Sequence, residues 1–322
     1  MKFIKKNDLS KIVFVSGSTR SGKIILSRII SSLKRSENIT VDHLIEQLPI
    51  MTRLGELSNE ACITLLKYAV HLRTYDNFIG RNTNFKTTDF TSIFKTENPK
   101  KYFRRLISNK DIYGDSNEGD TAIKNIKKEN ILFNMMIHYE LMHVDIFLRA
   151  FPKSKFYCME RHPIDLVYSW INKKYSSTFL ENPRNATITY KYKNKIVPYY
   201  AFGWEEKYIK SNYVDKIIFM IENSTKVSKQ KYNKLSELNK KKVKKISFDK
   251  LVLDPEKIIN KICIDLKTEK TGYTNKILEE ENCPRELDIK IRDKKMEKIK
   301  KKSSNEGFNV LKRLSRDFDR KG

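Results

Sequence analysis

Long apolar runs and closely spaced cysteines are both missing from this sequence of 322 residues. None of its apolar runs approaches the roughly 20 residues that a membrane-spanning helix needs. The four cysteines are widely separated, so they show neither the paired spacing of a zinc site nor the density of a disulfide framework. Residues 1–11 are too polar for a signal peptide. These absences favour a soluble protein of a reducing compartment, and we expect a cytoplasmic location.

Acidic residues are also scarce relative to basic ones. The chain has 39 Asp and Glu against 65 Lys and Arg, which gives a net charge of +26. Such a charge attracts polyanions, whether phosphorylated cofactors, acidic glycans, nucleic acid or membrane surfaces. A purely compositional origin stays open, because the lysines are spread through the polar stretches. No signature of a nucleic-acid-binding fold is visible, so nucleic acid is not an expected partner.

What the sequence does contain is an alternation of short apolar runs with helical patterns. The runs at 12–15, 156–159 and 243–248 are typical of buried strands, whereas 58–75 and 308–318 have helical spacing. We also expect a strand over 38–44 and a helix over 131–151, and Ile217 to Ile221 fits either structure. The alternation predicts an α/β fold, with a doubly wound, mostly parallel sheet flanked by helices.

Between Gly80 and Gly119 these patterns dissolve into polar residues with scattered Phe and Tyr. A loop of that length inside a compact domain is unusual and is often functional. We therefore expect one domain over residues 1–322, with a partly helical substrate-recognition insertion at about 76–125. A lid and a helical insertion remain open as alternatives.

The first strand leads into a glycine-bearing loop that fits a phosphate. Gly17 to Lys23 satisfies the pattern G-x-x-x-x-G-K, whose backbone amides cradle phosphate groups before a helix N-terminus. The next residue is Ile24, whereas nucleotide hydrolases place a metal-binding Ser or Thr there. An aliphatic side chain cannot coordinate magnesium, so ordinary ATP or GTP hydrolysis lacks a needed part.

A second strand, turn and helix follows much later in the chain. Arg161 ends the apolar run 156–159, Pro163 can begin a helix, and Ser169 lies two helical turns further on. An Arg at a strand end and a Ser on the next helix are suited to grip a terminal phosphate together. Two such loops suggest a nucleotide that carries phosphate at both ends.

Together these segments resemble the sulfotransferases that use 3′-phosphoadenosine 5′-phosphosulfate. Residues 20–23, Arg-Ser-Gly-Lys, are similar to the family's 5′-phosphosulfate loop, and Arg161 with Ser169 matches its 3′-phosphate motif. Residues 150–156 are similar to the stretch before that motif, and 246–256 to a later strand-to-helix element. Lys23 and Ile24 depart from the family, which has threonines there.

The resemblance implies a P-loop-like sulfotransferase fold, transfer of a sulfuryl group to an acceptor hydroxyl, and specific nucleotide contacts. The residues implied to bind the donor are Arg20, Ser21, Gly22, Lys23, Arg161 and Ser169. Arg20 is also expected to stabilise the departing 5′-phosphate. Sulfuryl carries less charge than phosphoryl, so no metal is expected.

A general base must take the proton of the acceptor hydroxyl. His43 and Glu46 lie after an early strand, where open parallel sheets place their ligands. We favour His43, because the usual pKa of histidine suits neutral pH, and keep Glu46 as the alternative. We interpret His138 and His143, on the predicted helix over 131–151, as packing or orienting residues.

The main rival is a P-loop kinase or nucleotide hydrolase, with Glu222 as a metal-site acid at a strand end. A basic binding module for nucleic acid or acidic polysaccharide is a weaker alternative, supported only by charge. For a sulfotransferase, the breadth of the family makes glycan or glycolipid hydroxyls the first expectation for the acceptor, ahead of small alcohols and phenols. The oligomeric state is not predicted.

Overall fold

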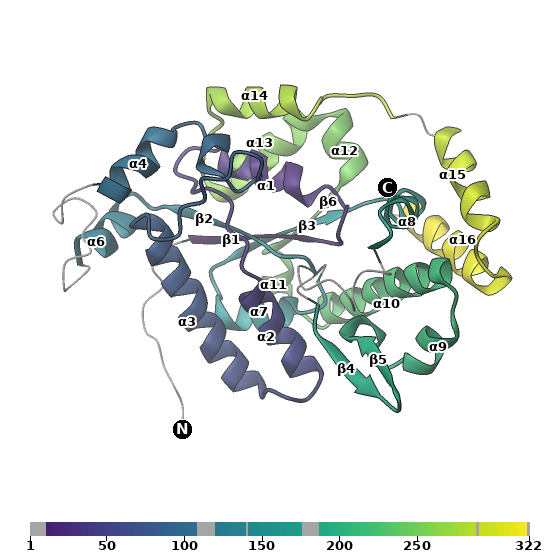
Figure 1. Cartoon of the computed structure of the whole chain (residues 1–322). Coiled ribbons are helices and arrows are strands. Elements are labelled where there is room, and N and C mark those ends of the chain that lie inside the picture. Colours follow the sequence, from purple (N-terminus) through teal and green to yellow (C-terminus); the bar gives the residue numbers. More distant parts are fainter. Residues whose placement is uncertain (1–10, 108–119, 140, 176–186, 288–289, 321–322) are drawn as a thin grey trace.

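The computed structural model describes residues 11–107, 120–139, 141–175, 187–287 and 290–320. At its centre is a four-stranded parallel sheet with the order β2-β1-β3-β6 (Figure 1). Its strands are β1 (Lys11–Gly17), β2 (Leu132–Met136), β3 (Lys155–Glu160) and β6 (Val243–Ser247). Helices cover both faces, so the predicted α/β class with a doubly wound parallel sheet is confirmed.

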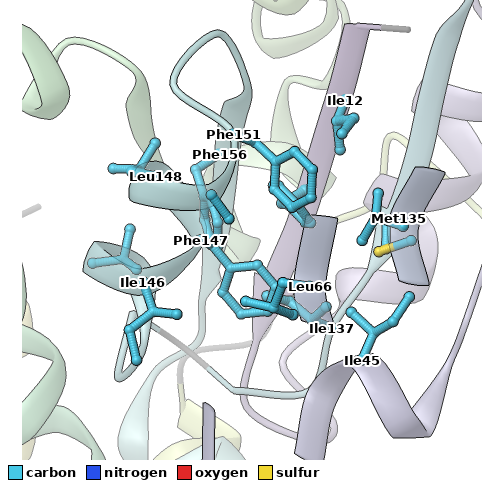
Figure 2. Close-up of a cluster of buried hydrophobic side chains, with 14 of the residues drawn as sticks. Ile12, Ile45, Leu66, Met135, Ile137, Ile146, Phe147, Leu148, Phe151 and Phe156 are labelled. Carbon is cyan, nitrogen blue, oxygen red and sulfur yellow. The ribbon is translucent and has the colours of Figure 1, made fainter. Parts of the chain in front are cut away.

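Alternate residues of β1 contribute their side chains to two separate hydrophobic cores, one on each face of the sheet. Val13 and Val15 face one core, which is closed by α1 (Lys23–Ser31), α12 (Phe248–Leu253), α13 (Pro255–Leu266) and α14 (Gly272–Glu280). Ile12 and Phe14 face the other, which is closed by α2 (His43–Arg53), α3 (Asn59–Phe78) and α7 (Val144–Ala150). Figure 2 shows this second core, where Phe147, Phe151 and Phe156 gather. Because both faces are buried there, β1, β2 and β3 are largely apolar, whereas the edge strand β6 has two exposed lysines.

A third apolar cluster lies beside the sheet and forms around α8 (Pro163–Asn172) and α10 (Tyr213–Asn233). The remaining elements are β4 (Thr189–Tyr192), β5 (Lys195–Pro198), η3 (Tyr199–Ala201), α9 (Glu205–Lys210), α11 (Glu237–Lys240), α15 (Lys290–Lys300) and α16 (Asn305–Asp319). Strands β4 and β5 form an antiparallel pair that the sequence did not predict. In the described part of the chain, no helix is both long and apolar enough to cross a bilayer.

Several predicted elements form as expected, and their capping residues explain where they begin. The strand at 243–248 and the helices at 58–75 and 308–318 correspond to β6, α3 and α16. Ser58 and Asp254 cap α3 and α13 by accepting backbone hydrogen bonds, and Pro255 takes the first position of α13. These are short-range effects, which a sequence specifies directly.

The helix expected over 131–151 is wrong in its first half, because Leu132–Met136 forms the buried strand β2. A strand buried on both faces and a buried helix both appear as continuous apolar runs, so the pattern could not separate them. The strand expected over 38–44 is also wrong. Only isolated bridges join Ser36 to Leu132 and Thr40 to Met135, and α2 begins at His43. The ambiguous run Ile217 to Ile221 is helical and lies in α10.

The segment predicted as an insertion is partly helical. It contains η1 (Ile93–Lys95), α4 (Pro99–Ile107) and α6 (Asp120–Lys128), while 108–119 lie outside the described residues. A buried ion pair attaches α4 to the sheet edge: Arg105 donates to both carboxylate oxygens of Glu37 at 2.8 Å, and Lys101 donates at 2.8 Å as well. The side chains of Glu37 and Arg105 are 3% and 1% exposed, which makes this pair inaccessible to water. A role for the segment in substrate recognition stays a prediction.

Strands β1, β2 and β3 end together at the carboxyl edge of the sheet. Val15 pairs with Met136, and Gly17 pairs with Met159, so the loops after β1, β2 and β3 leave side by side. In parallel sheets this carboxyl edge is where ligands bind, at the point where the chain changes direction along the sheet. In the order β2-β1-β3-β6 that point lies between β1 and β3.

Replacing Glu37 by Gln tests the attachment of α4. Burial raises the pKa of Glu37, but the charges and hydrogen bonds of Arg105 and Lys101 outweigh it and hold the pKa at about 2, below the usual 4.5. The stabilisation is therefore complete above pH 4.5 and is lost as the pH falls toward 2. At neutral pH we expect Glu37→Gln to lower the free energy of unfolding by about 3 kcal/mol, because it leaves Arg105 buried and unpaired. Urea unfolding from pH 7 to pH 2.5 should show the difference shrinking below pH 4.5; a constant difference would contradict this account.

Candidate active site

The loop between β1 and α1 has the backbone of a phosphate-binding turn. Arg20 and Gly22 have φ values of +68° and +99°, and Gly22 precedes α1 without a side-chain cap on the first amides of the helix. The ammonium of Lys23 turns back and donates to the carbonyls of Gly17 at 3.2 Å and Ser18 at 3.4 Å. A helix N-terminus with uncapped amides and an adjoining ammonium is suited to an anion.

One hydroxyl of this loop is buried without a partner. Ser21 is 1% exposed, and its Oγ has no hydrogen-bond partner among the described residues. It lies against Gly17, where an added Cβ would come within 2.5 Å of that oxygen. A buried unpaired hydroxyl is unfavourable unless something bonds to it, so Ser21 is a candidate donor to a bound group.

The second predicted segment packs directly onto the first. Arg161 follows β3 and donates through Nη1 to the carbonyl of Arg20 at 2.7 Å. Ser169 on α8 accepts a hydrogen bond from Nε of Arg20 at 3.2 Å. The neighbouring Trp170 donates through its indole nitrogen to the carbonyl of Thr19 at 2.7 Å. Two stretches about 140 residues apart in the sequence therefore form one site.

Both segments line the same pocket, which has a volume of about 260 Å³. Ser18 and Ser21 come from the first loop, and Glu160 and Arg161 from the second. The opposite wall comes from α10 and α16, where Lys229 adds another cation. The pocket thus brings the two loops within reach of a single ligand.

Phe248, the first residue of α12, lies beneath both loops. The guanidinium of Arg161 is 4.6 Å from the centre of its ring, and that of Arg285 is 5.5 Å from it. An added Cβ on Gly22 would lie 2.4 Å from Cδ2 of the same ring. Arg285, which follows a stretch without a recognisable motif, was not predicted from the sequence.

The charges around Arg161 favour an anion. Burial lowers the pKa of the Arg161 guanidinium, Asp165 raises it, and Arg20 and Arg285 lower it. Its Nε is buried and has no hydrogen-bond partner among the described residues. A phosphate bound here would reduce the repulsion among these guanidiniums and would accept a hydrogen bond from Nε of Arg161.

Asp165, in the first turn of α8, pairs with cations of a distant helix. It accepts hydrogen bonds from Arg292 at 2.8 Å and from Lys295, both on α15. Arg292 also bonds to Asp249, and these cations keep the pKa of Asp165 below its usual range against the opposing effect of burial. The N-terminus of α8 is capped instead by the ring of His162, which accepts from the amide of Ile164. Residues near the end of the chain therefore fix the helix that carries Ser169.

The loop after β2 and the first turn of α2 bring three further side chains together. Nδ1 of His138 lies 2.9 Å from each carboxylate oxygen of Glu46, which is 1% exposed. The ring of His43 stacks on that of His138 with the centres 5.8 Å apart. A carboxylate accepts the Nδ1 proton, so the neutral ring keeps its lone pair on Nε2. His138 is therefore arranged as a base, although the sequence pattern indicated packing or orienting.

Lys23 links this cluster to the first loop. Burial lowers the pKa of His138, the charge of Lys23 lowers it further, and Glu46 raises it. His138 is consequently neutral at pH 7 and lies near the ammonium that faces the phosphate loop. His143, by contrast, is buried, and burial lowers its pKa to about 3, which fits the packing role predicted for it.

These three side chains could also hold a metal ion. The ligand atoms of His43, Glu46 and His138 all lie within 4.8 Å of one another. Two of the three already bond to each other through Nδ1 and the carboxylate. We interpret the cluster as a hydrogen-bonded histidine and carboxylate; that the protein needs no metal stays a prediction.

Comparison with known proteins adds the following. Neither a protein-family model nor a curated protein matches the sequence. Among solved structures, the chain is similar to the sulfotransferase domain of the Synechococcus PCC 7002 olefin synthase, with 13% identity, a TM-score of 0.42, and coverage of 89% of this chain and 82% of that one. It is also similar to the sulfotransferase domain from the curacin biosynthetic pathway, with 14% identity, a TM-score of 0.44, and coverage of 88% and 80%.

A third similar structure is sulfotransferase STF9 from Mycobacterium avium, with 9% identity, a TM-score of 0.43, and coverage of 91% of this chain and 76% of that one. All three TM-scores are below 0.5, so the function proposed below depends on the geometry of the site alone.

Gly22 offers a test of the loop. We expect Gly22→Ala to weaken binding of adenosine 3′,5′-bisphosphate by roughly 100-fold or more, because the new Cβ meets Phe248 and the φ of +99° disfavours any side chain. Isothermal titration calorimetry measures this directly. Gly272→Ala is the matched control, since an added Cβ there has no atom within 4 Å. Unchanged affinity in Gly22→Ala would mean that the loop does not contact the ligand.

Proposed function

We propose that the protein transfers a sulfuryl group from 3′-phosphoadenosine 5′-phosphosulfate to an acceptor hydroxyl. The observation that carries this proposal is the direct junction of the two loops, where Arg161 bonds to the backbone of Arg20 and both loops line one pocket. A phosphate loop alone would fit many nucleotides. A second cationic site joined to it fits a nucleotide with phosphate on two positions.

In this proposal the first loop binds the 5′-phosphosulfate. The backbone of Ser21, Gly22 and Lys23 donates to it, and Lys23 and Arg20 stabilise the charge that grows on the departing 5′-phosphate. Arg161 and Ser169 hold the 3′-phosphate, with Arg285 as a further cation beside them. Arg20 reaches Ser169, so one residue connects the two phosphate sites.

His138 is the proposed general base, and Glu46 positions it. As the acceptor oxygen forms its bond to sulfur, the bond from sulfur to the 5′-phosphate oxygen breaks, and adenosine 3′,5′-bisphosphate leaves. The acceptor proton moves to Nε2 of His138. The proton on Nδ1 stays on the ring and remains hydrogen-bonded to the carboxylate of Glu46, which stabilises the imidazolium. His43, the base favoured from the sequence, is exposed and stacks on His138, where it can contact an acceptor.

A glycan or glycolipid is the proposed class of acceptor. A second pocket, of about 180 Å³, adjoins the start of α2, and it is lined by Asn38, Asn77, Asn82 and Asn84 together with Thr40, Thr83 and Thr91. Arg73, which also lines it, bonds to Asp42, the residue just before His43. Side-chain amides and hydroxyls suit a polyhydroxylated ligand.

The residue predicted to hold a metal in the kinase alternative is not at a strand end. Glu222 lies inside α10 and pairs with Arg313. Ile24 stands in the second position of α1, where a Ser or Thr would be needed for magnesium. No observation on the described residues favours this alternative over sulfuryl transfer.

Arg161 tests the proposed recognition of the 3′-phosphate. We expect Arg161→Ala to weaken binding of adenosine 3′,5′-bisphosphate by about 100-fold, through loss of a charge-assisted bidentate contact, and to weaken AMP binding much less, through loss of the bond to the Arg20 carbonyl alone. Titration calorimetry without and with magnesium gives both affinities. Arg313→Ala, which removes an exposed guanidinium on α16, is the control and should bind both nucleotides normally. Equal losses for the two nucleotides would remove the role given to Arg161.

The pH dependence of kcat tests the base. Because the pKa of His138 lies below 6.5, we expect the rate to rise with pH below that value and to level off by neutral pH. Glu46→Gln removes the charge that raises this pKa, so the acid limb should move to lower pH and kcat should fall about 10- to 100-fold. Lys23→Met should move the limb the opposite way. His138→Gln should abolish the limb, and a limb that survives there would assign the proton to another group.

A further inference from the structure

Three phenylalanines form an exposed apolar tip on the segment before and along α4, far from any role in the proposed chemistry. Phe85, Phe94 and Phe103 are 43%, 43% and 38% exposed. Their rings contact one another, with centres 5.6 to 6.4 Å apart. Leu106 and Ile107 on α4 are 42% and 81% exposed. We call these five residues the phenylalanine tip, and α4 lies at the outer edge of the molecule (upper left of Figure 1).

Basic side chains surround the phenylalanine tip. Residues 81–107 contain seven Lys and Arg against two acids, Asp89 and Glu97. Lys86, Lys95, Lys100 and Arg104 are exposed. Along α4, Lys100 and Arg104 are four residues apart, as are Phe103 and Ile107, so basic and apolar side chains share the outer face of the helix.

The inner face of α4 is fixed, so the tip is a rigid surface. Arg105 bonds to Glu37, and its guanidinium lies 4.4 Å from the ring centre of Phe78. Tyr102 is 7% exposed, and its hydroxyl accepts from the backbone amide of Asn38 at 3.1 Å. The exposed apolar area is therefore present in the folded chain and is not a consequence of loose packing.

We propose that the phenylalanine tip inserts into the surface of an anionic lipid bilayer. Such side chains suit the surface of an anionic bilayer. The aromatic and aliphatic groups can insert among the acyl chains, while the surrounding Lys and Arg contact the negatively charged headgroups. A second copy of this chain fits poorly, because two faces with the same excess of positive charge repel. Nucleic acid fits less well than lipid. The rings tilt 45° to 61° against one another, so they offer no flat surface on which bases could stack. The aliphatic side chains of Leu106 and Ile107 can neither stack on bases nor hydrogen-bond to them.

Flotation of the full-length protein with vesicles tests the proposal. We expect binding to vesicles of phosphatidylcholine with phosphatidylserine, and little binding to phosphatidylcholine alone. Replacing Phe85, Phe94 and Phe103 together by Ser should weaken binding by roughly tenfold or more, and K86E/K95E by a similar factor that vanishes at high salt. The matched control is L238S/I264S, which removes two side chains that are 69% and 78% exposed elsewhere.

Phe103→Trp gives a second measurement that preserves the apolar tip. Its fluorescence should shift to shorter wavelength with anionic vesicles, and lipids brominated on their acyl chains should quench it, whereas the parent's Trp170 and Trp204 should respond little. If the triple Ser variant binds the vesicles as tightly as the wild-type protein does, the proposal is overturned. A single-stranded oligonucleotide that binds the tip more tightly than the vesicles do would also overturn it. Neither outcome bears on nucleotide binding, so the proposed function would stand.

Discussion

The carbonyl of Arg20 is the point at which the proposed site is held together. The loop after β1 has left-handed backbone at Arg20 and Gly22, and residues outside the loop secure it. Arg161 donates to the Arg20 carbonyl and Trp170 to that of Thr19, so α8 and its preceding turn hold the loop from the side. In the proposed site, the donors assigned to one end of the nucleotide are thus shaped by the residues assigned to the other end. A ligand that contacts both loops would meet a single rigid surface, which reduces the entropy lost on binding.

Phe248 is a third residue, after Arg161 and Trp170, that contacts the loop after β1. Its ring lies against Gly22, and the guanidiniums of Arg161 and Arg285 lie over the ring. An aromatic face stabilises cations without neutralising them. The charges therefore stay available for an anion, in contrast to the surface ion pairs that occupy many other lysines and arginines of this chain.

The sequence was informative where the chemistry is local. A glycine pattern after an apolar run predicted the first loop, and Pro163 predicted the start of α8. The fold class followed from the alternation of elements. These features depend on neighbours within a few residues, so a single sequence can carry them.

Other features depend on contacts between distant segments. His138 was assigned to a helix because the apolar run before it has no decisive period, and only its place after β2 shows that it reaches Glu46. Arg285 and Phe248 belong to the site through packing of α12 and the segment after α14 against the loops. The phenylalanine tip was seen as scattered aromatics, since the pairing of Phe85 with Phe103 needs the turn between them.

The ion pairs of Asp165 affect how the chain acquires its structure during synthesis. Arg292 and Lys295, which neutralise this carboxylate, lie more than 120 positions after it. All four strands of the sheet and α8 precede α15 in the chain, so they are synthesised before these two cations exist. The carboxylate of Asp165 therefore acquires its ion pairs only once residues 290–300 have been made. The final packing of α8, and with it the position of Ser169, is thus completed late in synthesis.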